Sequence, residues 1–183
     1  MTTSIGQTAL ESLLDSIDQS RDQLIGRLAG LGDAEYLWEP APGCWSVRSG
    51  EDGHTADFPE DDPDPAPLTT IAWRLWHIAV DCMDFYSGRA FGTSGTGLSG
   101  RQFVVDAAAA ATLVDAAIAN FRNGLVGKGP EGVGELLGDD WGPYRDHRYY
   151  DLGLHAHREL THHGAEVGTM RDLYRWTVDS RRA

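Results

Sequence analysis

The sequence is poor in positive charge and in cysteine. Its 15 Lys and Arg stand against 28 Asp and Glu, which gives a formal net charge of −13. A phosphate backbone is bound through clustered Lys and Arg, so this balance argues against a nucleic-acid partner. The two cysteines, Cys44 and Cys82, are too far apart to indicate a disulfide framework or a CxxC metal site. We therefore expect reduced thiols, as in a cytoplasmic protein.

Long apolar runs are also missing. No stretch approaches the length of about 18 residues that a membrane-spanning helix needs. The opening segment MTTSIGQTALESLLD lacks the basic start and apolar core of a signal peptide. Both absences predict a cytoplasmic location and no membrane partner. Glycine motifs of the GxGxxG and GxxxxGK[ST] types, which bind phosphates, are absent as well.

The chain length and apolar content suit one globular domain. With 183 residues, of which 41% are hydrophobic, residues 1–183 are expected to form a single domain. An acidic, proline-rich segment interrupts it at about residues 49–66. Asp61, Asp62 and Asp64 in this segment resemble a calcium loop, but the ligand order and closing Glu of an EF-hand are missing. We interpret the segment as a solvated acidic loop.

Apolar residues at helical spacing predict four long helices and no convincing strand. The helices cover about residues 7–30, 67/70–89, 101–125 and 150–178. Thr69 or Thr70 is expected to cap the second helix, because a hydroxyl can accept from an otherwise unpaired backbone N–H. Four such helices in a chain of this length predict an all-α fold, a four-helix bundle with long loops.

The last predicted helix carries a stripe of titratable residues within and around RELTHHGAEVG (158–168). Positions four apart share a helix face. The stripe consists of His155, Glu159, His163, Glu166, Met170 and Leu173. Because it becomes apolar toward its end, we expect it to face the bundle interior. A buried His beside a buried Glu needs partners, and a metal ion is one way to satisfy both.

Spacing excludes two familiar metal motifs on this helix. A zinc-protease HExxH motif needs two His four apart, whereas His157 and His162 are five apart and differ by about 140° around the helix. Glu159 and His162 have the ExxH spacing of di-iron bundles, but the other ExxH match, Glu51 to His54, falls in the acidic loop. A dinuclear site is therefore not predicted.

Two residues on one helix hold a metal poorly, so a third ligand must come from elsewhere. Outside the last helix the histidines are His54, His77 and His147. His77 lies in the most apolar helix, within WRLWHIAVD. A single His on such a helix is usually a hydrogen-bonded core residue, but the two-ligand stripe on another helix favours a ligand.

Three segments carry a resemblance to a known family: LGDAEYLWEPAPGCWSVR, TTIAWRLWHIAVD and RELTHHGAEVGTMRDLY. The chain resembles the DinB-like superfamily of the DinB/YfiT type over nearly its whole length. The resemblance implies a four-helix bundle of up-down-down-up topology. It also implies a divalent metal held by one His on the second helix and by a pair four apart on the last helix, commonly in the pattern H-x-x-x-H-x-G-Q.

Carried over residue by residue, the resemblance implies His77, Glu159 and His163 as metal ligands, with Glu159 in place of the usual first His, as in the related mycothiol-dependent maleylpyruvate isomerases. A register fixed instead by HxG would make His162 the ligand and place Arg158 at the first ligand position. We prefer the first register, because it leaves no cation where a ligand should be. His162 is then a candidate catalytic acid/base group or a helix-surface His, and His155 is a lesser candidate ligand.

The resemblance further implies a mononuclear site for Zn²⁺, Ni²⁺, Mn²⁺ or Fe²⁺ with an open coordination position. It implies transfer of a low-molecular-weight thiol of the mycothiol or bacillithiol type, or a related hydrolysis. The alternatives are a non-catalytic, stress-related bundle that binds a metal or ligand, and a metal-free bundle. Asp81 is a candidate to orient a ligand, and Tyr86 and Trp73 are candidates to line a pocket. We expect a small-molecule substrate and a homodimer.

Overall fold

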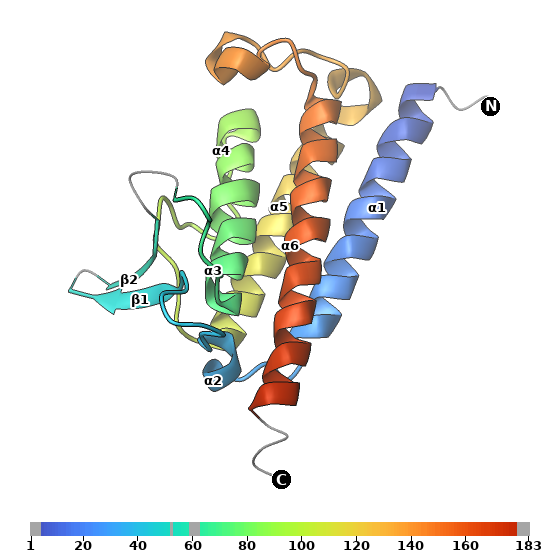
Figure 1. The fold of residues 1–183 in the computed structure, drawn as a ribbon. Coiled ribbons are helices and arrows are strands. Elements are labelled where there is room, and N and C mark those ends of the chain that lie inside the picture. Colours follow the sequence, from blue (N-terminus) through green and yellow to red (C-terminus); the bar gives the residue numbers. More distant parts are fainter. Residues whose placement is uncertain (1–4, 52, 59–62, 179–183) are drawn as a thin grey trace.

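The computed structural model describes residues 5–51, 53–58 and 63–178. They are mostly helical, in agreement with the predicted all-α class. The long helical segments lie side by side (Figure 1). They are α1 (Ile5–Leu28), a continuous segment of α3 (Ile71–Trp76), η1 (His77–Asp84) and α4 (Phe85–Phe91), then α5 (Ala107–Gly132) and α6 (Tyr149–Thr177). The short helices α2 (Asp33–Tyr36) and η2 (Asp139–Tyr144) lie in the connections.

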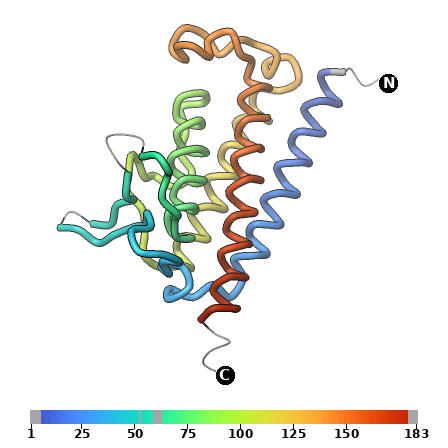
Figure 2. Tube along the Cα trace, viewed as in Figure 1, coloured from blue at the N-terminus to red at the C-terminus, as the bar shows by residue number. Residues whose placement is uncertain are grey.

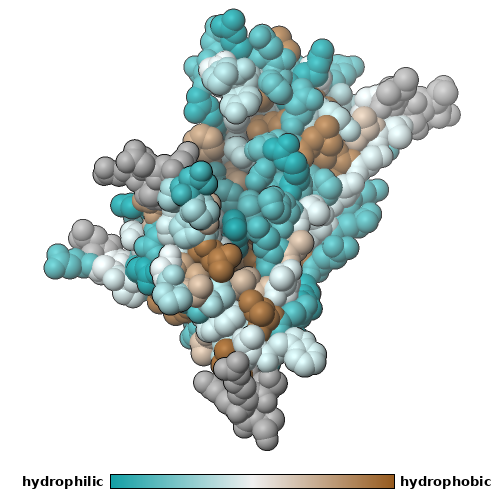
Figure 3. All heavy atoms as spheres, in the orientation of Figure 1, coloured by the Kyte–Doolittle hydropathy of each residue, from teal (hydrophilic) through white to brown (hydrophobic). Residues whose placement is uncertain are grey.

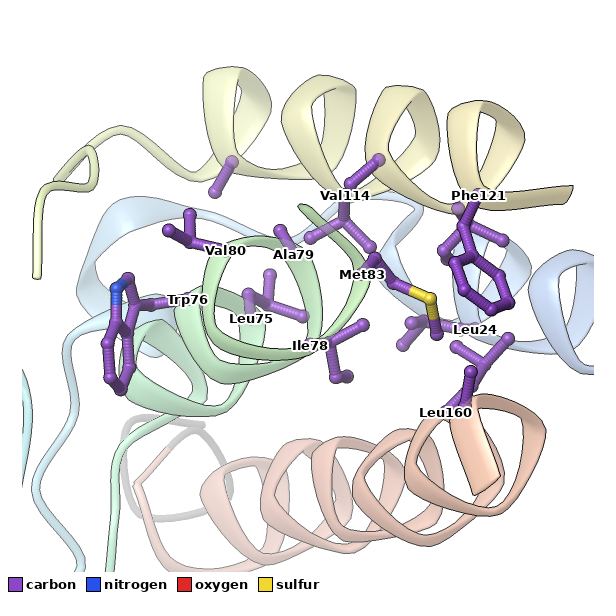
Figure 4. Packing of buried hydrophobic residues seen from close by; sticks show 14 of the residues in the cluster. Leu24, Leu75, Trp76, Ile78, Ala79, Val80, Met83, Val114, Phe121 and Leu160 are labelled. Carbon is purple, nitrogen blue, oxygen red and sulfur yellow. The ribbon is translucent and has the colours of Figure 1, made fainter. Parts of the chain in front are cut away.

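The long helical segments run in two opposite directions, and η1 packs against α6. The helices α1 and α6 run one way, whereas the α3–η1–α4 segment and α5 run the other way (Figures 1 and 2). Buried side chains from all four segments meet between them (Figure 4). Leu75 and Ile78, for example, are fully buried and belong to the same core cluster as Phe121 of α5 and Leu160 of α6. The core thus fixes the position of the α3–η1–α4 segment relative to α6.

Side-chain caps set the starts of two helices. The Thr70 hydroxyl accepts a hydrogen bond from the Trp73 backbone N–H at 3.2 Å, as expected for the second predicted helix. For the third, the expected start at Arg101 is wrong. Asp106 accepts from the Ala109 N–H at 2.6 Å, so α5 begins at Ala107. This helix also continues beyond Leu125 to Gly132, with a kink at Gly129, where φ is +68°.

The central part of the second predicted helix is a π-helix. Over His77–Asp84 the segment is neither interrupted nor an ordinary α-helix. In a π-helix each backbone hydrogen bond reaches five residues along the chain, and such segments occur frequently at functional sites. Residues five apart, which differ by about 140° on an α-helix, are thereby brought closer to one face.

The prediction of no strand is wrong for one short hairpin. The strands β1 (Val47–Gly50) and β2 (Gly53–Ala56) pair antiparallel, with Val47 opposite Ala56. Only this pair of strand residues is buried, at 3% and 2% exposure, so the alternation is too short to read in the sequence. The hairpin begins the segment interpreted as an acidic loop. Asp61 and Asp62 of that segment lie outside the described residues.

The apolar end of the predicted stripe on α6 is also partly wrong. Leu173 is 42% exposed, whereas Arg171 and Tyr174 are buried. Arg171 reaches Glu35, which is also buried, through two hydrogen bonds of 2.8 and 3.0 Å. This ion pair ties the connection after α1 to the last turns of α6. The apolar pattern predicted that Leu173 faces the interior, but Arg171 is the residue that does so.

The face of the molecule seen in Figure 3 is mainly polar. Hydrophilic residues predominate on the face seen in Figure 3, where hydrophobic residues form small separate patches. Within the described ranges, every helix is too short or too polar to cross a membrane.

Candidate metal centre

The three predicted ligands meet between η1 and α6. His77 is the first residue of η1, and its ring lies edge-to-face with that of His163, with 4.6 Å between the ring centroids. On α6, the His163 Nε2 atom lies 3.2 Å from the Glu159 Oε2 atom. The structure therefore brings His77, Glu159 and His163 together.

Burial distinguishes the two adjacent histidines. The His163 side chain is 9% exposed, whereas the His162 side chain is 64% exposed and stacks on the His163 ring. Arg158, which the alternative register placed at a ligand position, is 68% exposed. The inward-facing pair is thus Glu159 and His163. His162 lies at the surface beside the centre, and its catalytic role stays a prediction.

A carboxylate holds the far side of the His163 ring. The Nδ1 atom of His163 lies 2.7 Å from Oε2 of Glu166, which also receives the Arg74 Nε–H at 2.9 Å. An ionised carboxylate only accepts hydrogen bonds, and both ring nitrogens face one; the contact of Nδ1 is the shorter of the two, at 2.7 Å against 3.2 Å, and favours the proton on Nδ1, although an Arg74 N–H also approaches Nδ1 at 3.3 Å. The Nε2 atom then carries a lone pair, and it is this atom that faces Glu159.

The ring of His77 is held in the same manner. Its Nδ1 atom lies 2.9 Å from Oδ2 of Asp81, which leaves the Nε2 lone pair on the side of the centre. Trp73 stacks on the other face of the ring, at 5.3 Å between centroids and 8° between planes. Asp81 thus makes the contact of an orienting residue. Trp73 is buried against His77 rather than exposed in a pocket.

This arrangement fits a metal ion. Two atoms with lone pairs, His163 Nε2 and Glu159 Oε2, face each other at 3.2 Å, which is unfavourable unless a cation or proton lies between them. In a tetrahedral site with bonds of about 2.0–2.1 Å, two nitrogen or oxygen ligands lie about 3.3 Å apart. A carboxylate behind each imidazole is also the usual support of a metal-bound His.

Among the described residues, two groups of three ligand atoms lie within 4.8 Å of one another, and the predicted ligands are divided between them. One group is His77, Cys82 and Glu159, and the other is His162, His163 and Glu166. Arg74 already contacts Glu166 in the second group. A second cation there is disfavoured, which favours the first group. His163 is not a member of that group, but its Nε2 atom lies 3.2 Å from Glu159, which is.

Sequence reasoning missed Cys82. On an α-helix residues five apart do not share a face, so the sequence does not connect Cys82 with His77. In the structure its Sγ atom lies 3.5 Å from Nε2 of His77. Burial raises the pKa of the Cys82 thiol, and the carboxylates of Asp81 and Glu159 raise it further. Cys82 lies near the centre because the segment is a π-helix, and the spacing of apolar residues in the sequence does not predict a π-helix.

The two glutamates of the centre, Glu159 and Glu166, are stabilised as carboxylates. Burial raises the pKa of each, but nearby donors and positive charges outweigh this effect, so both pKa values lie below the ordinary value. For Glu159 the chief donor is Arg158, and for Glu166 it is His163, followed by the charge of Arg74. Ionised carboxylates are the form that binds a metal.

A cleft adjoins the Glu159 side of the centre. Its volume is about 1040 Å³, and it lies between α4, the segment around η2, and α6. His155 and Tyr86 line it and are joined by a 2.8 Å hydrogen bond between Nε2 and the hydroxyl. The Nδ1 atom of His155 lies 3.7 Å from Glu159 Oε1, and burial lowers the pKa of His155. Tyr86 therefore lines a pocket, as predicted. His155 contacts the predicted ligand Glu159.

A comparison with known families identifies the family of the chain. The family model of the DinB superfamily, whose members typically bind metal, matches residues 16–167, a range that contains all three predicted ligands. The chain belongs to the DinB superfamily. No curated protein and no solved structure matches the chain significantly.

Proposed function

We propose that the protein is a mononuclear, divalent-metal-dependent enzyme with His77, Glu159 and His163 as ligands. The observation that carries the proposal is the matched orientation of the two imidazoles. Each is held at Nδ1 by a carboxylate, at 2.9 Å for His77 and 2.7 Å for His163, and each presents Nε2 to the centre. We further propose that residues 1–183 form one domain with the up-down-down-up bundle topology of the superfamily.

The proposed reaction is the transfer of a low-molecular-weight thiol, of the mycothiol or bacillithiol type, to a small electrophile. A bound Zn²⁺, Ni²⁺, Mn²⁺ or Fe²⁺ supplies a Lewis acid that lowers the pKa of a coordinated thiol or water. A related hydrolysis would use the same centre. Asp81 and Glu166 fix the ring orientations and tautomers, and Glu159 offers Oε2 to the centre while its Oε1 faces Arg158 at 3.2 Å.

The cleft beside Glu159 is the proposed substrate site. Its polar groups nearest the centre are His155, Tyr86 and Arg158, and aromatic side chains such as Trp141 line its far end. A pocket of this size, with a few polar groups at one end, suits a small-molecule substrate. His162 does not line this cleft; it stacks on His163 at the surface and is proposed to act as an acid/base group. The homodimer and the cytoplasmic location remain expectations.

Elemental analysis tests the metal proposal. We expect about one equivalent of metal in the protein after expression in metal-replete medium, and strong loss in His77→Ala, Glu159→Gln and His163→Ala. His157→Ala is the matched control, because this histidine lies on the same helix but binds Ser20 of α1 at 3.1 Å. A wild-type protein that takes up neither Zn²⁺ nor Ni²⁺ would overturn the proposal.

A thiol-transfer assay tests the reaction. The loaded protein is incubated with a small electrophile and each of mycothiol, bacillithiol and glutathione, and adduct is measured with and without a chelator. We expect metal-dependent adduct with at least one thiol and a reduced rate in His162→Ala. Metal binding without any metal-dependent adduct would favour the non-catalytic alternative.

A further inference from the structure

Cys82 lies where a further ligand would lie. Its Sγ atom is 3.5 Å from the Nε2 atom of His77, the atom directed at the centre. The ligand atoms of Cys82, His77 and Glu159 all lie within 4.8 Å of one another. The cysteine is free and 3% exposed, so its sulfur is held among buried neighbours and not at the protein surface.

The backbone conformation explains this placement. His77 and Cys82 are five residues apart and both belong to the π-helix η1. On an α-helix the two side chains would differ by about 140°, and the sulfur would point into the apolar core. The π-helix brings residues five apart closer to one face, and such segments are frequent at functional sites. The local distortion and the cysteine therefore serve the same centre.

We propose that the Cys82 thiolate is a fourth ligand to the metal held by His77, Glu159 and His163. The inference rests on the metal centre proposed above. In a tetrahedral site with a metal–sulfur bond of about 2.3 Å and a metal–nitrogen bond of about 2.0 Å, sulfur and nitrogen lie about 3.5 Å apart. The observed separation matches this value. On coordination the thiol proton leaves to solvent, so metal uptake releases it.

A fourth protein ligand changes what the site can do. One soft thiolate beside two imidazoles and a carboxylate favours Zn²⁺ over Mn²⁺. Four protein ligands leave no open position in a tetrahedral site. Cys82 then competes with an incoming thiol for the same position. Removal of the cysteine is therefore expected to weaken metal binding while easing the binding of the small thiol.

Cobalt spectroscopy tests the proposal with a readout that does not depend on activity. Co²⁺ is titrated into the metal-free wild type, Cys82→Ser, Cys82→Ala and the control Cys44→Ser. Cys44 is the other buried free cysteine, so this control retains Cys82 as the single thiol. We expect a near-ultraviolet thiolate-to-cobalt band in the wild type and in Cys44→Ser. The band should vanish in both Cys82 variants, which keep the visible bands of bound cobalt.

The outcomes separate the two proposals. Visible cobalt bands without a thiolate band in the wild type would overturn the role of Cys82 and leave the metal centre standing. Loss of the thiolate band in Cys44→Ser would do the same. A wild type that binds no cobalt would overturn the metal centre and, with it, the fourth ligand. Should a Cys82 variant fail to fold, the band in Cys44→Ser alone assigns the sulfur.

Discussion

Replacing Asp81 by alanine should weaken metal binding without removing a ligand. Oδ2 of Asp81 accepts the Nδ1 proton of His77 at 2.9 Å, which fixes the ring and keeps Nε2 free for the metal. In Asp81→Ala the ring loses this partner and can rotate or change its tautomer. The ring keeps its contacts with Trp73, His163 and Cys82, but none of them holds Nδ1.

The size of the effect follows from the exposure of the contact. Loss of a group that supports a metal ligand typically costs about 10- to 100-fold in affinity. The Asp81 side chain is 42% exposed, so water can replace part of the hydrogen bond. We therefore expect the lower end, about 10-fold or about 1.4 kcal/mol. Asp81→Asn retains an uncharged acceptor and should show a smaller loss.

Competition for Zn²⁺ against a chromophoric chelator measures this affinity. Asp18→Ala is the matched control, since Asp18 is 37% exposed and makes a comparable 2.6 Å ion pair, with Arg122, away from the centre. The control should bind Zn²⁺ as the wild type does. If Asp81→Ala also binds Zn²⁺ with wild-type affinity, the assigned orientation of His77 is incorrect.

Three further predictions concern stability and are checked by urea unfolding. A Cβ on Gly153 would lie 2.6 Å from Leu13, so Gly153→Ala should destabilise the protein by about 1–3 kcal/mol. At Gly164 the nearest contact of a Cβ is at 3.8 Å, so Gly164→Ala should be neutral or stabilising. Equal effects of the two substitutions would contradict the packing. Glu35→Gln should cost about 3–5 kcal/mol, because it leaves Arg171, 3% exposed, without its charged partner; a loss below about 1 kcal/mol would contradict a buried pair. In metal-free protein, Glu159 and Glu166 have pKa values below those of the unfolded chain, so the free energy of unfolding should fall as the pH drops below about 4. The double variant with Gln at both positions should lose less stability over this pH range. Parallel profiles of the wild type and the double variant would contradict the prediction.

Much of the fold could be predicted because long helices leave a strong apolar period in the sequence. The first and last predicted helices end within two residues of α1 and α6. The same geometry placed Glu159 and His163 on one face, because four residues make slightly more than one turn. That His163 and not His162 is buried agrees with the preferred register. The family resemblance connected this pair to His77, some eighty residues upstream.

Three features could not be predicted, and each has its own physical cause. The spacing of apolar residues does not distinguish a π-helix from an α-helix here, so the sequence does not predict that Cys82 lies close to His77. The start of α5 follows from one side-chain cap, at Asp106, which an alanine-rich stretch obscures. The buried Arg171 needs Glu35, a distant residue, to make its burial favourable. Only in this last case does the deciding partner lie far away in the sequence.

The most direct test of the metal centre is an anomalous-diffraction map from crystals of the Zn²⁺-loaded protein, recorded at the zinc edge. We predict one peak between η1 and α6, about 2.0–2.2 Å from Nε2 of His77, Nε2 of His163 and a carboxylate oxygen of Glu159. A peak bound to His162 and Glu166 instead, or no peak in loaded crystals, would contradict the account.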